Sequence, residues 1–138
     1  MYIDHICIAV RSIDKAVKKL CNMLDYDIKT QKVTNSRQQV NVIFIEKKGS
    51  IDIKLIEPSN VDSPLWAFIK KGGGLHHICF FTEDVSKTTE SMKEKGAIVV
   101  AEPEPGEAFD DELISFLYLG AGLNIELIDT KKRKSQIT

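Results

Sequence analysis

The sequence has no long hydrophobic run, no signal-peptide pattern and no excess of charge of one sign. Nothing in its 138 residues approaches the roughly 18 consecutive apolar residues of a transmembrane helix, and the N-terminus lacks a basic segment followed by an apolar core. Nineteen basic and twenty acidic side chains leave a formal net charge of -1, which provides no overall attraction to nucleic acid or anionic membranes. We therefore expect a cytoplasmic protein whose partners are small molecules or proteins, with no nucleic acid or membrane partner.

Cysteine is also scarce. Cys7, Cys21 and Cys79 are odd in number and lie in apolar segments, which favours reduced thiols over a disulfide framework. A chain of this length with 43% hydrophobic residues can bury enough apolar surface to fold without disulfides or a structural metal. We expect a single domain over residues 1–138.

The chain repeats itself with an offset of 72 residues. The segment "DHICIAVRSIDKAVKKL" resembles "HHICFFTEDVSKTTESM", and their shared "HIC" aligns His5 with His77. The same offset aligns "IDIKLIE" at 51–57 with "LNIELID" at 123–129 without a gap. Apolar alternation and helix-capping residues recur in the same order, so each half is predicted to be a βαβββ unit.

Each predicted unit starts with a strand and a capped helix. In the first half, Ser12 is expected to cap a helix with an apolar stripe. In the second half, Gly96 is expected to end the helix. The predicted strands are 2–10, 26–33, 40–46 and 50–57 in the first half, and 75–82, 97–101, 113–119 and 123–129 around a helix at 85–95 in the second.

Two segments fall outside this repeat. Ser63, Pro64 and Gly72 predict a short linking helix between the halves. The stretch "EPEPGEAFDDE" at 102–112 is predicted to be a loop long enough to lie over a site. The fold class is therefore α+β, with two βαβββ modules in tandem whose curved mixed sheets are expected to form a cavity. We expect module one at 1–58, the linking helix at 63–72, module two at 73–130 and a solvated polar tail at 131–138.

The duplication places chemically capable side chains at equivalent positions. His5 and His77 fall on the first strands of the two modules, and Lys54 and Glu126 on the last strands. If each module places its first and last strands side by side, these four side chains converge. A lone histidine on a strand is usually structural, but two at equivalent points with a glutamate on an apolar strand favour a metal or catalytic site. Imidazole and carboxylate suit zinc, nickel, cobalt, manganese or iron, whereas a lysine ammonium repels a cation.

Strand alternation assigns the neighbours of these residues. Because successive side chains point to opposite faces, His76, the counterpart of Asp4, is predicted to point away from His77 and to be structural. Cys7 and Cys79 share the face of the two candidate histidines. They are predicted to line the cavity as small apolar groups.

These motifs resemble a known family. The segments "DHICIAV", "DSPLWAFIKKGGGLHHICF" and "LNIELID" are similar to those of the vicinal oxygen chelate (glyoxalase/bleomycin resistance/dioxygenase) superfamily, above all methylmalonyl-CoA epimerase and bacterial glyoxalase I-like proteins. The resemblance covers roughly residues 2–129. It implies a divalent metal held by His5, His77 and Glu126, with Lys54 at the position of the remaining ligand.

The resemblance also implies a function. The expected activity is that of a metal-dependent isomerase or lyase of the glyoxalase I or methylmalonyl-CoA epimerase type, which moves a proton beside a thioester or hemithioacetal oxygen. Glu126 would be the base and Lys54 a replacement proton donor. The implied cofactor is zinc, nickel, cobalt or manganese, the substrate an acyl thioester or glutathione adduct, and the assembly a homodimer. Two alternatives stay open: a metal-free binding or resistance-type protein, because Lys54 replaces a ligand, and an iron-dependent dioxygenase.

Overall fold

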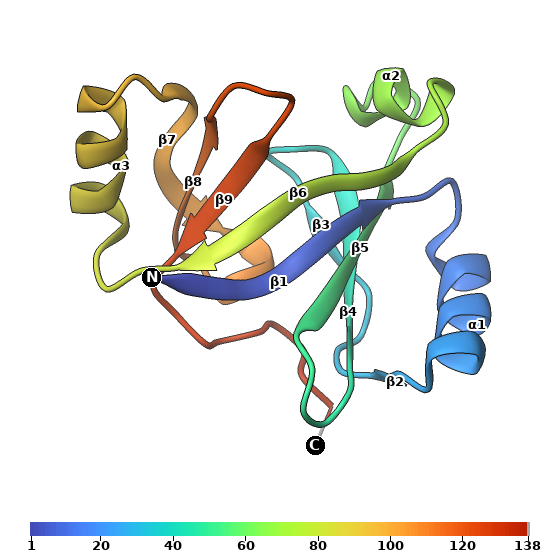
Figure 1. Cartoon of the computed structure of the whole chain (residues 1–138). Coiled ribbons are helices and arrows are strands. Elements are labelled where there is room, and N and C mark those ends of the chain that lie inside the picture. Colours follow the sequence, from blue (N-terminus) through green and yellow to red (C-terminus); the bar gives the residue numbers. More distant parts are fainter. Residues whose placement is uncertain (138) are drawn as a thin grey trace.

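The computed structural model describes residues 1–137 and has an α+β fold, as the sequence predicts. One curved sheet carries most of the chain, with helices on its outer sides (Figure 1). The elements in chain order are β1 (Tyr2–Ala9), α1 (Ile13–Leu24), β2 (Asp27–Ile28), β3 (Val33–Asn35), β4 (Val40–Glu46), β5 (Asp52–Pro58), α2 (Leu65–Lys70), β6 (Gly74–Phe81), α3 (Val85–Glu94), β7 (Ile98–Gly106), the 3-10 helix η1 (Glu107–Phe109), β8 (Glu112–Tyr118) and β9 (Asn124–Ile128).

The strand order brings the first and last strands of each module together. The order is β2-β4-β5-β1-β6-β9-β8-β7, with β3 paired to β4. β1 runs parallel to β5, β6 runs parallel to β9, and the antiparallel β1–β6 pair joins the two modules. The adjacency on which the convergence argument depended is therefore confirmed.

The hydrogen bonds at the helix N-termini repeat the internal symmetry. Ser12 caps α1 and Asp84 caps α3, each accepting from the backbone N–H three residues on. Glu57 Oε1 accepts from the first N–H of α1 at 2.6 Å, and Asp129 Oδ2 accepts from the first N–H of α3 at 3.1 Å. Both pairs of acceptors are 72 residues apart, so the offset read from the sequence is also an offset in structure.

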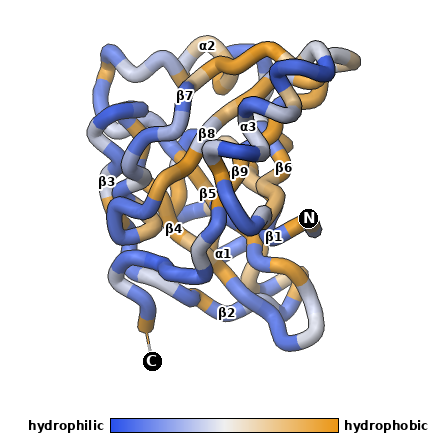
Figure 2. Tube along the Cα trace, turned by 90° about the vertical axis from the view of Figure 1, so that its left-hand side faces the viewer, coloured by the Kyte–Doolittle hydropathy of each residue, from blue (hydrophilic) through white to orange (hydrophobic). Residues whose placement is uncertain are grey.

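Apolar side chains fill both faces of the sheet. Two clusters lie beneath the helices, one under α1 and one around α3. A third cluster occupies the concave side between the modules and contains Phe44, Phe109 and Ile128. Figure 2 shows the hydrophobic segments running through the strands, with hydrophilic residues in many of the turns. Among residues 1–137 no helix is long and apolar enough to span a membrane.

The predicted loop at 102–112 is mostly ordered secondary structure. Residues 102–106 extend β7, and η1 follows. Two prolines are tolerated in this strand because β7 is the edge of the sheet and its pairing with β8 is irregular. Phe109, in η1, is 1% exposed and belongs to the concave-side core.

The C-terminal tail is not a solvated end over residues 131–137. Ile137 N–H donates to the carbonyl of Lys29 at 2.8 Å, and Gln31 N–H donates to the carbonyl of Ser135 at 3.0 Å. The tail thus satisfies the backbone groups between β2 and β3, where a continuous strand at 26–33 was predicted. Arg133 is 5% exposed, whereas the lysines beside it are exposed. Residue 138 lies outside the described part of the chain.

The linking segment is shorter than predicted. The helix begins at Leu65 and ends at Lys70, although Ser63 Oγ still accepts from Leu65 N–H at 3.3 Å. Gly73 follows with φ 67, and a Cβ at this position would lie 2.8 Å from the carbonyl oxygen of Ala9. Glycine is therefore required where the chain turns into β6.

Candidate functional site

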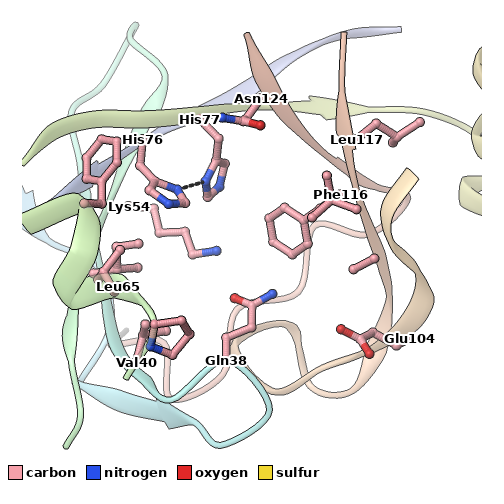
Figure 3. Close-up of a pocket in the computed structure, with 15 residues that line it drawn as sticks. Gln38, Val40, Lys54, Leu65, His76, His77, Glu104, Phe116, Leu117 and Asn124 are labelled. Atoms are coloured by element: carbon pink, nitrogen blue, oxygen red, sulfur yellow. Dashed lines mark hydrogen bonds between the residues drawn. The ribbon is translucent and has the colours of Figure 1, made fainter. Parts of the chain in front are cut away.

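A cavity of about 410 Å³ opens on the concave side of the sheet, between the modules. Its walls are largely apolar and come from both modules and from α2 (Figure 3). The polar side chains that line it are Gln38, Lys54, His76, His77, Glu104 and Asn124. A mostly apolar cavity with a few convergent polar groups is the usual form of a small-molecule site.

A buried polar cluster lies at the base of this cavity. Glu126 Oε1 lies 3.2 Å from His5 Nε2 and 3.2 Å from His77 Nε2. Lys54 Nζ donates to both Glu126 oxygens at 3.4 Å. We call these four residues the floor cluster. None is more than 4% exposed, so the convergence expected from the sequence brings together buried polar groups.

Two β-bulges orient the histidines of the floor cluster. In the β1–β6 pairing, Asp4 and His76 are each an extra residue without a register partner, and they are equivalent by the 72-residue offset. Each bonds to the histidine that follows it: Asp4 Oδ2 lies 2.7 Å from His5 Nδ1, and His76 Nδ1 lies 2.8 Å from His77 Nδ1. The prediction that His76 points away from His77 is wrong, because the bulge interrupts strand alternation and turns His76 into the same cavity.

Asp4 is held by cations from the C-terminal tail. Arg133 donates from Nη2 to Asp4 Oδ2, and Lys131 Nζ donates to Asp4 Oδ1 at 2.8 Å. The guanidinium carbon of Arg133 also lies 4.5 Å from the ring centroid of Phe44. Burial alone would raise the pKa of Asp4, but the hydrogen bond from His5 and the charge of Arg133 hold it well below its usual range. The tail therefore fixes the carboxylate that orients His5.

Lys54 and Glu126 form a buried ion pair. Burial opposes the charged form of Lys54, but the Glu126 carboxylate outweighs it and raises the pKa of the lysine. Burial likewise acts to raise the pKa of Glu126, but the Lys54 charge and the hydrogen bonds from the two histidines hold it well below the usual value. An ammonium and a carboxylate therefore face each other at neutral pH.

The pH dependence of stability tests the buried state of His77. Burial is the main cause that lowers its pKa to about 4, so the folded protein holds it neutral while the unfolded chain binds a proton near pH 6.5. Between these values the unfolded state binds more protons, so stability falls as pH falls. We expect the free energy of unfolding, measured in urea, to drop by roughly 1–2 kcal/mol from pH 7 to pH 5. His76, whose pKa burial also lowers, adds to the same trend.

A His77→Gln variant is the control for this measurement. It removes the titrating group while keeping a polar side chain, so its free energy of unfolding should depend less on pH over the same range. A wild-type stability that is flat or rises between pH 7 and pH 5 would contradict the assignment of a neutral buried His77.

The donor atoms of the floor cluster allow a test of the expected metal. The ligand atoms of His5, His77 and Glu126 lie within 4.8 Å of one another. Metal–ligand bonds of about 2.1 Å place neighbouring donors roughly 3.4 Å apart in a tetrahedral site, which is close to the 3.2 Å separations seen here. The Lys54 ammonium, however, already bonds to both carboxylate oxygens. With this charged group in place, the cluster does not fit a divalent cation.

The two buried cysteines of the β1–β6 pair are core residues. Cys7 and Cys79 are fully buried and pair across the strands with His77 and His5, respectively. Burial is the main cause that raises the pKa of each thiol, so both are uncharged at neutral pH. The prediction that they line the cavity is wrong, because both are packed into the apolar core beside the floor cluster and are not among the residues of the cavity walls.

This geometry agrees with the family to which the sequence profile assigns the chain. The profile of the "Glyoxalase/Bleomycin resistance protein/Dioxygenase superfamily" matches residues 4–116. The chain belongs to this superfamily. The uncharacterised protein YqjC of Bacillus subtilis is 40% identical over 94 residues, which cover 67% of this chain and 66% of YqjC.

Two relatives within the superfamily carry enzyme names. The ethylmalonyl-CoA/methylmalonyl-CoA epimerase of Cereibacter sphaeroides is 30% identical over 118 residues, covering 84% of this chain and 87% of that enzyme. A probable lactoylglutathione lyase of Synechocystis is 28% identical and covers 97% and 99% of the two chains. The match spans only 52–57% of the mammalian mitochondrial methylmalonyl-CoA epimerases.

Solved structures share the whole fold. A variant of Streptomyces coelicolor methylmalonyl-CoA epimerase in complex with 2-nitronate-propionyl-CoA superposes with a TM-score of 0.83 at 27% identity, covering 95% of this chain and 98% of the enzyme. A methylmalonyl-CoA epimerase in complex with methylmalonyl-CoA and NH4+ gives 0.82 at 26% identity, covering 97% of each chain. The superfamily fold predicted from the sequence is confirmed.

The sequence alone missed two contributors to the site. Arg133 lies in a run of lysines, and nothing in its neighbourhood distinguishes it from a solvated tail residue. His76 carried a usable signal, because its counterpart Asp4 is also polar in an otherwise apolar strand. Two polar residues at equivalent positions next to two candidate site residues could have indicated paired bulges.

Proposed function

We propose that this protein is an enzyme of the isomerase or lyase type that moves a proton on the carbon beside a thioester or hemithioacetal oxygen. One observation carries the proposal: the duplicated strands bring the floor cluster together at the base of a cavity, in a chain similar over most of its length to acyl-CoA epimerases. An acyl thioester is the preferred substrate class, because the structural neighbours are described with acyl-CoA ligands.

Lys54 is the proposed electrophilic group. Its side chain lines the cavity and reaches toward its centre (Figure 3). Two of its N–H groups face Glu126, and the ammonium has a third to offer to a substrate oxygen. When a proton leaves the adjacent carbon, negative charge develops on that oxygen, and a fixed cation in a cavity with largely apolar walls stabilises it. That one structural neighbour is described with both methylmalonyl-CoA and NH4+ supports a role for an ammonium group.

The hydrogen-bonded imidazoles of His76 and His77 are the proposed acceptor for that proton. Glu126 is fully buried and its carboxylate contacts His5, His77 and Lys54, so it reaches the cavity only through these partners. His76 and His77 line the cavity, and burial lowers the pKa of both, which keeps them neutral and able to accept a proton at neutral pH. In this arrangement Glu126 orients His77 and balances Lys54, in place of the direct base role that the family resemblance implied.

Exchange of the substrate's alpha proton with solvent tests the proposal. Methylmalonyl-CoA and ethylmalonyl-CoA are incubated with the protein in deuterium oxide, and deuterium incorporation is followed by mass spectrometry. We expect exchange well above the buffer rate, and a loss of roughly 100-fold in Lys54→Met, because the oxygen loses its stabilising cation.

Lys70→Met is the matched control for this experiment. Lys70 is an exposed lysine on α2, outside the polar groups of the cavity, so its loss should leave the exchange rate unchanged. Absence of exchange for both acyl-CoA esters and for a glutathione hemithioacetal would refute the proposed activity.

The Lys54–Glu126 pair also favours a second candidate function, the binding of a small molecule without catalysis. A cavity whose buried charges are already paired can bind a small molecule without performing chemistry on it. Saturable binding of the acyl thioester with no proton exchange would establish this binding function. The iron-dependent dioxygenase alternative is not proposed, because it depends on the same metal position that the ammonium disfavours.

A further inference from the structure

The Lys54 ammonium lies close to any position that a metal ion bound to Glu126 could take. An ion bonded to Glu126 Oε1 could lie no further than about 5.5 Å from Lys54 Nζ, the sum of a metal–oxygen bond of about 2.1 Å and the 3.4 Å Nζ–Oε1 distance. Both positive charges would then lie among side chains that are no more than 4% exposed. Repulsion at this separation is poorly screened in a protein interior.

The charge balance of the floor cluster also disfavours a divalent ion. Glu126 supplies the one negative charge of the floor cluster, and Lys54 already balances it. His5 and His77 can contribute only neutral donor nitrogens to an ion. A divalent cation would therefore leave the cluster with a net charge of about +2. Without the lysine charge, the cluster would carry the negative charge that an ion needs.

Lys54 places its ammonium on Glu126. Its side chain is 3% exposed, and in the described part of the chain its Nζ donates only to the two Glu126 oxygens. The ring of Phe109 lies 5.3 Å away, over the same amine. Moving the ammonium aside would cost the ion pair with Glu126. Glu104 also lines the cavity, but in the described part of the chain no ion pair joins it to Lys54.

We infer that Lys54 is a built-in cation that takes the place of a divalent metal, and that the site binds the oxygen of a thioester substrate through its ammonium without any metal ion. The role given to the substrate oxygen rests on the proposed function; the exclusion of the metal does not. The three donors that remain, His5, His77 and Glu126, form a latent metal site that the lysine keeps closed.

Metal titration tests this inference without a substrate. Purified wild type, Lys54→Gln and Lys54→Met are treated with EDTA, dialysed and titrated with Co²⁺ and Zn²⁺ by calorimetry. We expect no saturable binding to wild type below about 1 mM, and at least tenfold tighter binding to Lys54→Gln, which removes the charge and adds a ligand oxygen. Lys54→Met should also bind more tightly than wild type, through three protein ligands.

Lys29→Gln is the matched control. It removes a lysine from a different ion pair, the partly buried Lys29–Asp52 pair, which lies away from the cavity. It should bind metal no better than wild type. Circular dichroism establishes that each variant is folded. If the Lys54 variants do not fold, the wild-type titration decides alone: saturable metal binding overturns the inference, and its absence supports it.

Two results would overturn the inference. One is saturable wild-type binding within threefold of that of Lys54→Gln. The other is proton exchange by wild type that EDTA abolishes and Co²⁺ or Zn²⁺ restores. Absence of any exchange would refute the proposed function but would leave the metal titrations, and the inference on metal exclusion, to stand on their own result.

Discussion

Glu126→Gln is expected to reduce thioester proton exchange by about 1,000-fold or more. The carboxylate is the shared partner of His5, His77 and Lys54, so the substitution disturbs both the proposed proton acceptor and the proposed cation. A neutral amide also leaves the buried ammonium without a counter-charge, which costs about 3–5 kcal/mol when one partner of a buried pair is removed. The exchange rate by mass spectrometry and the unfolding free energy in urea are the two readouts.

Glu112→Gln provides the comparison. Glu112 is also a glutamate paired with a lysine on this sheet, but its pair with Lys132 is at the surface. Its loss should change stability by less than about 1 kcal/mol and leave exchange intact. A Glu126→Gln protein that retains more than a tenth of the wild-type exchange rate would show that the carboxylate does not organise the site.

Arg133→Met is expected to destabilise the fold by about 3–5 kcal/mol. Its guanidinium bonds to the buried Asp4 and lies over the rings of Phe44 and Phe109, at 4.5 and 5.2 Å from their centroids. Methionine keeps the apolar contact with the rings but leaves Asp4 with one fewer cation. Arg133 Nε has no hydrogen-bond partner among residues 1–137, so removing it offsets a small part of the loss. Urea denaturation at pH 7 measures the difference.

Lys134→Met is the matched control, because Lys134 is the adjacent basic residue of the tail and is exposed. Its substitution should change the unfolding free energy by no more than about 0.5 kcal/mol. The double variant Asp4→Asn with Arg133→Met should lose less than the sum of the single variants, because both remove the same pair. An Arg133→Met loss below 1 kcal/mol would show that the tail does not hold Asp4.

Much of the fold could be read from local patterns. The offset that aligns His5 with His77 also aligns the helix caps Ser12 and Asp84, and the structure contains both caps. Apolar alternation located the strands to within a few residues, except for 26–33 and 102–112. Those two segments depend on non-local contacts: the first pairs with the C-terminal tail, and the second lies at the sheet edge against β8.

Prediction of the candidate site was less complete. The sequence identified all four members of the floor cluster, because duplication placed them at equivalent positions. It assigned His76 to the wrong face, since alternation along one strand takes no account of an extra residue relative to the partner strand. It also treated the tail as solvated, because a lone arginine among lysines shows no preference for burial until Asp4 and two phenylalanine rings surround it.

The sequence by itself determined the repeat, the α+β class, the superfamily and the equivalence of Lys54 with Glu126, because each of these depends on residue type and spacing along the chain. Only the tertiary structure decided that Lys54 and Glu126 meet as a buried ion pair, with the nitrogen 3.4 Å from both oxygens. The reason is physical: electrostatic interaction and metal coordination change over a few ångströms, and those distances are set by strand order, bulges and packing rather than by any pattern within one segment.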